Sequence, residues 1–208
     1  MDKAINLVNL LGWTYLLVQT EIELVFNLED YVTSDISLSL SILRVIQLLQ
    51  VSDIVLLLMS KAKGNLLASF FQILGRNIVT LFVMEEDTGR LVYAFVVIVW
   101  SIAEVNRYLY YIFKDSPITG FLRYNGFLIL YPLGGVAETL VFNNYFARHP
   151  DVSDPVYYLL RFINGCIIIG IVLLYTYMLK ARKKYMKGLS TASPAEKEST
   201  PLPVPKRD

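Results

Sequence analysis

The amino-acid composition is typical of a membrane protein rather than of a soluble globular domain. Of 208 residues, 55% are hydrophobic and only 18% are charged, with a mean hydropathy of +0.49. Such a chain is too apolar to be disordered along its length. A net charge of +1 gives no electrostatic footprint for nucleic acid. One cysteine, Cys166, and one histidine, His149, exclude an internal disulfide and a multi-histidine metal site, so we expect no metal and no redox cofactor.

Six apolar stretches each have roughly the 20 residues needed to cross a hydrocarbon core about 30 Å thick. They lie at 4–25, 37–60, 65–84, 90–113, 117–147 and 156–180. The first carries Trp13 and has no small-residue cleavage site, so we expect it to be retained rather than removed as a signal peptide. The sequence therefore predicts an all-α polytopic membrane protein, a bundle of six transmembrane helices, over residues 1–188.

The distribution of lysine and arginine predicts the orientation of the bundle. With six spans both termini share a side, and that side holds most of the basic loop residues, whereas the opposite loops are rich in acids. By the positive-inside rule both termini are cytosolic. Residues 189–208 are rich in Ser, Thr, Pro and charge, and we expect them to form a disordered cytosolic tail. The basic residues on the predicted cytosolic side are Lys3, Lys61, Lys63, Lys114, Lys180, Arg182, Lys183, Lys184 and Lys187.

Charged residues inside the predicted spans are the most informative feature. A charge at mid-membrane costs roughly 2.5 to 3.5 kcal/mol on insertion scales, so these groups must face one another, water or a ligand. Helical rise places five of them in the cytosolic half, where they suit an anionic headgroup whose apolar tail lies in the membrane. Ion pairs that only join helices are an equally good interpretation. The residues are Arg44, Asp53, Arg76, Glu104, Arg107, Arg123, Glu138 and Arg161; the five are Asp53, Arg76, Glu104, Arg107 and Arg123.

Two of the predicted spans carry titratable side chains that share one helix face, as a catalytic site requires. On the fourth, Glu104 precedes Arg107 by three residues and Tyr108 by four, so it can hold either side chain on one helix face. On the fifth, Tyr131 and Glu138 are seven residues apart, close to two helical turns, and share a face about 10.5 Å apart along an ideal axis. Such a pair can supply an acid and a base, although it could also only join helices.

The segment between these two residues contains residues that disfavour a regular helix. Pro132, Gly134 and Gly135 at membrane depth predict a kink or an unwound turn, which is tolerated only where protein or a cavity satisfies the freed backbone groups. A bend toward the shared face would shorten the separation of Tyr131 and Glu138.

These residues resemble a known family. Leu122-Arg123-Tyr124, then Leu130-Tyr131-Pro132-Leu133-Gly134 and then Glu138 are similar to the signature of the endoplasmic-reticulum 3-hydroxyacyl-CoA dehydratases, also called the protein tyrosine phosphatase-like A family. The resemblance covers about residues 5 to 185. Supporting matches are Glu104-Val105, Arg107-Tyr108, Gln72, Arg76, and Tyr15 near Gly12-Trp13.

The resemblance implies a multi-pass enzyme of the endoplasmic reticulum membrane that dehydrates (3R)-3-hydroxyacyl-CoA to trans-2-enoyl-CoA, the third step of very-long-chain fatty acid elongation. Its partners are then an elongase condensing enzyme and ketoacyl and enoyl reductases. Tyr131 and Glu138 match the catalytic pair, with Tyr131 favoured as base and Glu138 as acid. Four residues match functionally important positions and are expected to bind substrate, supported by Glu104 and Tyr108: Arg76, Arg107, Arg123 and Gly134.

The sequence departs from the family at three positions and leaves other functions open. Gln50 and Asp53 stand where members usually carry a glutamate and a histidine, and Gly75 precedes the third-span arginine. A phosphatase needs a cysteine beside a phosphate-binding loop, and Cys166 has no such neighbours. A catalytically silent scaffold for elongation enzymes and a small transporter remain the alternatives.

Overall fold

The computed structural model describes residues 3–26, 36–59, 66–85, 88–151 and 155–191, and the regular structure within these ranges is entirely helical. Six helical segments follow one another and coincide with the six predicted spans, which confirms the predicted fold class. They are α1 (Lys3–Phe26), α3 (Ser37–Leu49) with α4 (Val51–Leu58), α5 (Leu66–Ile78) with the π-helical turn η1 (Val79–Val83), α6 (Arg90–Ile112), α7 (Pro117–Arg148) and α8 (Pro155–Thr191).

Two of the predicted spans are divided in a way that the apolar pattern did not indicate. The second is divided at Gln50, where the amide of Asp53 donates to the Gln50 carbonyl three residues back (2.9 Å) and tightens the turn. The third passes from α5 into the wider turn η1. Turns of this kind are common at functional sites.

Four of these helical segments are long and apolar enough to cross a membrane: Ser37–Leu58, Arg90–Ile112, Pro117–Arg148 and Pro155–Lys187. The segment Ser69–Val83 is a shorter apolar helix. Helix α1 has 24 residues, about 36 Å of rise, but its polar and acidic side chains lower its hydropathy. Length alone therefore allows α1 to span, and it packs mainly against α6.

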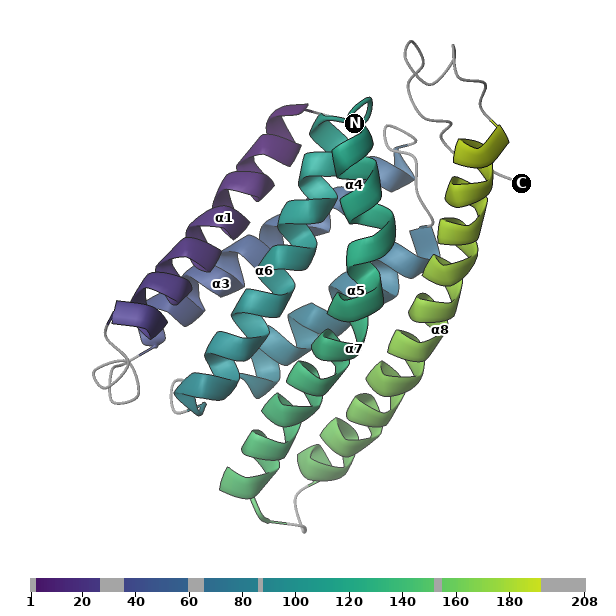
Figure 1. Ribbon diagram of the computed structural model, residues 1–208. Coiled ribbons are helices and arrows are strands. Elements are labelled where there is room, and N and C mark those ends of the chain that lie inside the picture. Colours follow the sequence, from purple (N-terminus) through teal and green to yellow (C-terminus); the bar gives the residue numbers. More distant parts are fainter. Residues whose placement is uncertain (1–2, 27–35, 60–65, 86–87, 152–154, 192–208) are drawn as a thin grey trace.

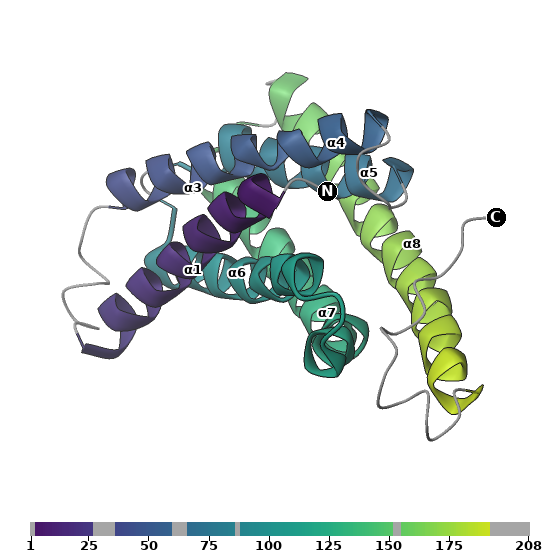
Figure 2. The ribbon, with the colours of Figure 1, turned by 90° about the horizontal axis from the view of Figure 1, so that it is seen from above.

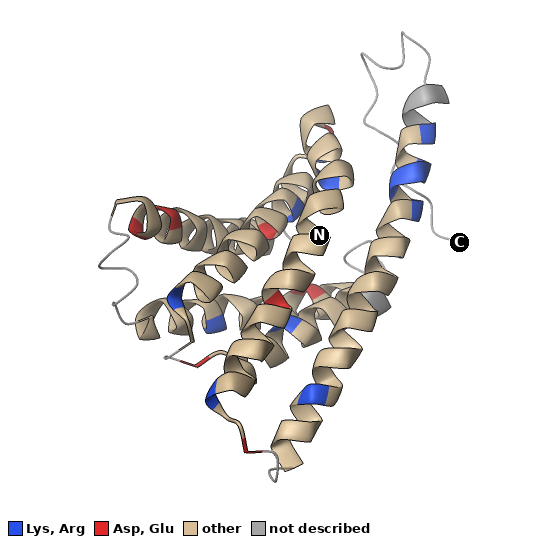
Figure 3. Ribbon diagram, turned by 60° about the horizontal axis from the view of Figure 1, so that its bottom comes forward, with Lys and Arg blue, Asp and Glu red and all other residues tan. Residues whose placement is uncertain are grey.

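The helices run up and down in two layers. Helix α6 contacts α1 on one side and α7 on the other, while α3, α4 and α5 lie across this first layer and α8 lies beside α7. Figure 2 shows the two layers from above. Helix α1 begins and α8 ends at the same end of the bundle in Figure 1. Figure 3 shows that charged residues are sparse along the helices, which suits a lipid environment.

The last helix is longer than expected. Helix α8 has 37 residues, about 55 Å of rise, and exceeds the hydrocarbon thickness. It continues to Thr191, so residues 189–191, which were expected to begin the disordered tail, are helical. Residues 192–208 of the predicted tail, and the loop residues Lys61 and Lys63, lie outside the described residues.

Candidate functional site

A chain of alternating charges lies between the two layers of helices. Glu104 on α6 accepts a hydrogen bond at one carboxylate oxygen from Arg76 on α5, and its other oxygen lies 2.8 Å from Nη2 of Arg107. The side chains of these three residues are 10% exposed or less. The predicted pairing of Glu104 with Arg107 is confirmed. The cost of placing these charges at membrane depth is thus offset by mutual contact.

Asp53 on α4 extends this chain of charges to the second predicted span. Its Oδ2 accepts hydrogen bonds from Nη2 of Arg107 (2.8 Å) and from the hydroxyl of Tyr108 (2.9 Å). Nη2 of Arg107 also lies 2.7 Å from that hydroxyl. The Tyr108 hydroxyl therefore contacts Asp53 rather than Glu104, which the spacing on α6 also allowed. The sequence identified Asp53 only as an intramembrane charge and a departure from the family pattern.

Trp100 links the charged chain to Glu138, and sequence reasoning missed it. Trp100 on α6 is 1% exposed and donates from Nε1 to Oε1 of the buried Glu138 on α7 (3.2 Å). The guanidinium of Arg76 lies over the Trp100 ring, 5.1 Å from its centroid. Trp100 precedes Glu104 by four residues, so the shared helix face was a signal in the sequence.

Tyr131 lies one turn after Phe127 on α7 and is half-buried, with the two rings in edge contact at 6.0 Å. The charges of Arg123, Arg76 and Arg107, and the opposite charge of Glu104, act on its hydroxyl. The charge of Arg76 also acts on the carboxyl group of Glu138. Arg76 is thus within electrostatic reach of both predicted catalytic groups. This arrangement suits the predicted pair, whose catalytic roles stay a prediction.

Helix α7 continues without interruption through Pro132. The unwound turn offered as one of two expectations is therefore wrong. Pro132 lacks an amide hydrogen, but a long helix retains the remaining bonds of its ladder. A Cβ on Gly134 would meet only Cγ1 of Val99, at 3.9 Å, which is ordinary contact. Packing therefore does not require a glycine at position 134.

The other intramembrane arginines lie apart from this chain. Arg123 is half-buried near the start of α7. Arg44 donates to the carbonyls of Thr80 (3.3 Å) and Met84 (3.0 Å) and so satisfies backbone groups at η1. Arg161 is exposed, 3.9 Å above the Phe146 ring. These contacts give Arg44 and Arg161 structural roles.

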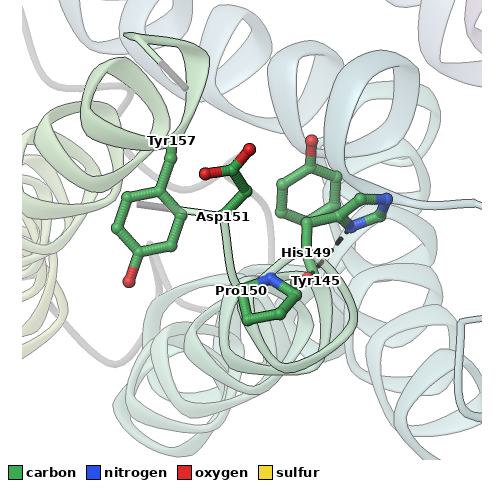
Figure 4. Close-up of a pocket in the computed structure, with 5 residues that line it drawn as sticks. All are labelled: Tyr145, His149, Pro150, Asp151 and Tyr157. Atoms are coloured by element: carbon green, nitrogen blue, oxygen red, sulfur yellow. Dashed lines mark hydrogen bonds between the residues drawn. The ribbon is translucent and has the colours of Figure 1, made fainter. Parts of the chain in front are cut away.

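A cavity of about 320 Å³ lies near the end of α7 that leads into α8, and Figure 4 shows its lining: Tyr145, His149, Pro150, Asp151 and Tyr157. None of the predicted site residues lines it. His149 is exposed, as expected, and its ring stacks on Tyr145 with the centroids 4.3 Å apart.

Cys166 is exposed on α8. Among the described residues no three His, Cys, Asp or Glu side chains gather in a way that could hold a metal ion.

Residues 47–188 match the model of a family described as "Protein tyrosine phosphatase-like protein, PTPLA". The chain is 26% identical to the very-long-chain (3R)-3-hydroxyacyl-CoA dehydratase of Gallus gallus over 87% of its own length and 56% of the relative's. It is 34% identical to a probable enzyme of that name from Schizosaccharomyces pombe, over 48% of this chain and 50% of the relative.

The human relative named very-long-chain (3R)-3-hydroxyacyl-CoA dehydratase 3 is 28% identical over 65% of this chain and 39% of its own length. The chain thus spans about half the length, or less, of the curated relatives it matches. No solved structure gives a significant match.

Proposed function

We propose that this chain, which belongs to the protein tyrosine phosphatase-like (PTPLA) family, dehydrates (3R)-3-hydroxyacyl-CoA to trans-2-enoyl-CoA. The names of its relatives support a dehydratase that acts on very-long-chain acyl-CoA. The observation that carries the proposal is that Tyr131 and Glu138, on one helix, both lie within electrostatic reach of Arg76, in a bundle that buries charges next to apolar surface.

The reaction needs three groups. A base removes the proton from C2, an acid donates a proton to the departing C3 hydroxyl, and donors stabilise the charge that develops on the thioester oxygen. The C3–O bond breaks, water leaves and a double bond forms between C2 and C3. We assign the base to Tyr131, on whose hydroxyl the charges of Arg123 and Arg76 act, and the acid to Glu138, whose carboxyl group is buried.

The remaining roles, which concern substrate binding, are assigned to three arginines. The charge of Arg76 acts on both groups, and Arg76 is assigned to the thioester. Arg123, half-buried near the start of α7, is assigned to the coenzyme A phosphates. Arg107 is held by Glu104 and Asp53, and its contribution to substrate binding is to fix Glu104 and, through it, Arg76. Gly134, between the two catalytic residues, leaves room for the acyl chain.

A direct assay tests the proposal. Purified protein in lipid nanodiscs is given a long-chain (3R)-3-hydroxyacyl-CoA, and trans-2-enoyl-CoA is followed by mass spectrometry. The wild type is expected to turn over, and Tyr131→Phe and Glu138→Gln to lose at least a hundredfold in kcat, since each removes a proton-transfer group.

Tyr158→Phe and Glu23→Gln, which change side chains of the same types elsewhere in the bundle, are the matched controls and should keep full activity. An inactive wild type that still copurifies with condensing enzyme would instead favour the scaffold function. The location in the endoplasmic reticulum, the cytosolic termini and the elongation partners belong to the same proposal, and protease protection of tagged termini in microsomes tests the topology.

A further inference from the structure

We infer that Trp100 is a positioning residue for the site: its indole N–H holds the carboxyl group of Glu138 while its ring face holds the guanidinium of Arg76. This inference rests on the proposed function. Two contacts support it, the hydrogen bond from Nε1 to Glu138 at 3.2 Å and the stacking of Arg76 at 5.1 Å.

The two contacts use different parts of the same side chain. The N–H lies at the ring edge, where the indole is electropositive, and the guanidinium lies on the face, where it is electronegative. Trp100 is 1% exposed, so neighbouring side chains hold the ring and its two partners cannot exchange places. A fixed separation between an acid and a cation is what preorganised catalysis requires.

Arg76 is held from its other side by the charged chain. Glu104 contacts Arg76, Arg107 contacts Glu104, and Asp53 contacts Arg107. Trp100 is therefore the link between that chain, on α4, α5 and α6, and Glu138 on α7. Among the described residues, the bond from Trp100 is the one hydrogen bond that the Glu138 side chain makes.

Trp13 provides a matched control for Trp100. It is the other tryptophan of the chain, is fully buried on α1, and its Nε1 has no hydrogen-bond partner in the described residues. Changing each tryptophan to phenylalanine removes the same atoms from an equally buried place. Only Trp100→Phe removes a hydrogen bond to Glu138.

The experiment compares Trp100→Phe, Trp13→Phe and wild type in the nanodisc assay. We expect Trp100→Phe to lose about 10- to 100-fold in kcat, the effect of one hydrogen bond to the carboxylate that Glu138 becomes as it gives up its proton, with KM within about twofold of wild type. Trp13→Phe should keep kcat within about threefold, because its indole N–H contacts no site residue. Trp100→Phe should have the lower thermal midpoint, because Glu138 loses its donor whereas Trp13→Phe removes an unpaired N–H. Both variants are therefore compared at a temperature at which both are fully folded, which separates positioning from folding.

Fluorescence gives a readout that does not depend on turnover. In a Trp13→Phe background Trp100 is the only tryptophan, and Glu138→Leu should shift its emission to shorter wavelength because the indole loses its acceptor. Glu23→Leu in the same background should leave the emission unchanged.

Equal kcat in both phenylalanine variants of an active enzyme overturns the inference, and so does a loss confined to KM or to the thermal midpoint. An unshifted emission in the Glu138→Leu chain overturns the contact itself. A wild type without turnover but with the emission shift would refute the proposed function, and with it the role of Trp100 in turnover, while leaving the contact intact.

Discussion

The side chain of Arg76 is held by two different kinds of partner, the carboxylate of Glu104 and the ring face of Trp100. A planar guanidinium can satisfy both at once, whereas an ammonium is a point charge that cannot stack in the same way. The planar shape of the Arg76 guanidinium is therefore required at this position in addition to its positive charge.

Replacing Arg76 by lysine tests this distinction. We expect kcat/KM for the hydroxyacyl-CoA to fall at least tenfold, because the charge is retained but its place over Trp100 is lost. Arg161→Lys is the control, since Arg161 also lies over an aromatic ring, Phe146, but is exposed. That variant should keep kcat/KM within about twofold. Equal values for both lysine variants would contradict the assignment of Arg76.

Gly134→Ala separates substrate space from helix packing. The added methyl group meets only Val99 at 3.9 Å, and alanine is favoured over glycine inside a helix by about 1 kcal/mol. The thermal midpoint should therefore stay constant or rise. If Gly134 leaves room for substrate, KM should rise several-fold in steady-state assays.

Gly135→Ala is the matched change for Gly134→Ala, because its methyl group would face Ile171 on α8 at 3.5 Å. It should leave KM unaltered. A Gly134→Ala chain with wild-type kinetics would remove this residue from the substrate site.

Residue spacing within one helix predicted part of this site. The contacts between residues on different helices became known only from the structure. The three-residue interval from Glu104 to Arg107 is enough to predict their contact. The contact of Asp53 with Arg107 joins residues 54 apart, and the contact of Trp100 with Glu138 joins residues 38 apart. Such pairs depend on which helices are neighbours and on their rotation, which a single apolar pattern does not encode.

At the scale of the elements, the helix that divides at Gln50 carries buried amides. Gln47 and Gln50 are both 0% exposed, and in the described part of the chain none of their side-chain polar atoms has a hydrogen-bond partner. Burying an amide without a partner costs about 1–3 kcal/mol. These two positions therefore lower stability rather than raise it.

Gln47→Met is expected to stabilise the protein by about 1–2 kcal/mol, because methionine has a similar length and no polar group to desolvate. The rise should be visible as a higher thermal midpoint in nanodiscs. Gln19→Met is the comparison, since the Gln19 amide donates to Glu23 at 3.0 Å and the change removes that bond. A lower midpoint for Gln47→Met would show that the amide has a partner in the membrane.

Element boundaries were largely predictable because six apolar runs and their polar loops are set by bilayer thickness. The predicted spans and the observed helices agree to within a few residues at most ends. The division at Gln50, the π-turn η1 and the unbroken helix through Pro132 were not predicted. Each depends on backbone hydrogen bonds that tertiary packing selects, and proline alone did not decide the outcome in α7.

At the scale of the whole molecule, the buried charges join the two layers of helices. Asp53 belongs to the layer of α3, α4 and α5, while Arg107 belongs to α6 in the other layer. Removing one member of a buried pair leaves an uncompensated charge and typically costs 3–5 kcal/mol, whereas replacing both by apolar residues is often neutral.

Asp53→Leu alone should therefore destabilise the bundle strongly, because Glu104, which Arg76 already shares, is then the one carboxylate among the described residues that is paired with Arg107. The double change Asp53→Leu with Arg107→Met removes both charges and leaves Glu104 paired with Arg76. We expect the double variant to recover at least half of the loss in thermal midpoint, measured in the same nanodiscs. If the double variant is instead as unstable as the sum of Asp53→Leu and Arg107→Met measured singly, the two side chains contribute independently and the ion pair does not join the layers.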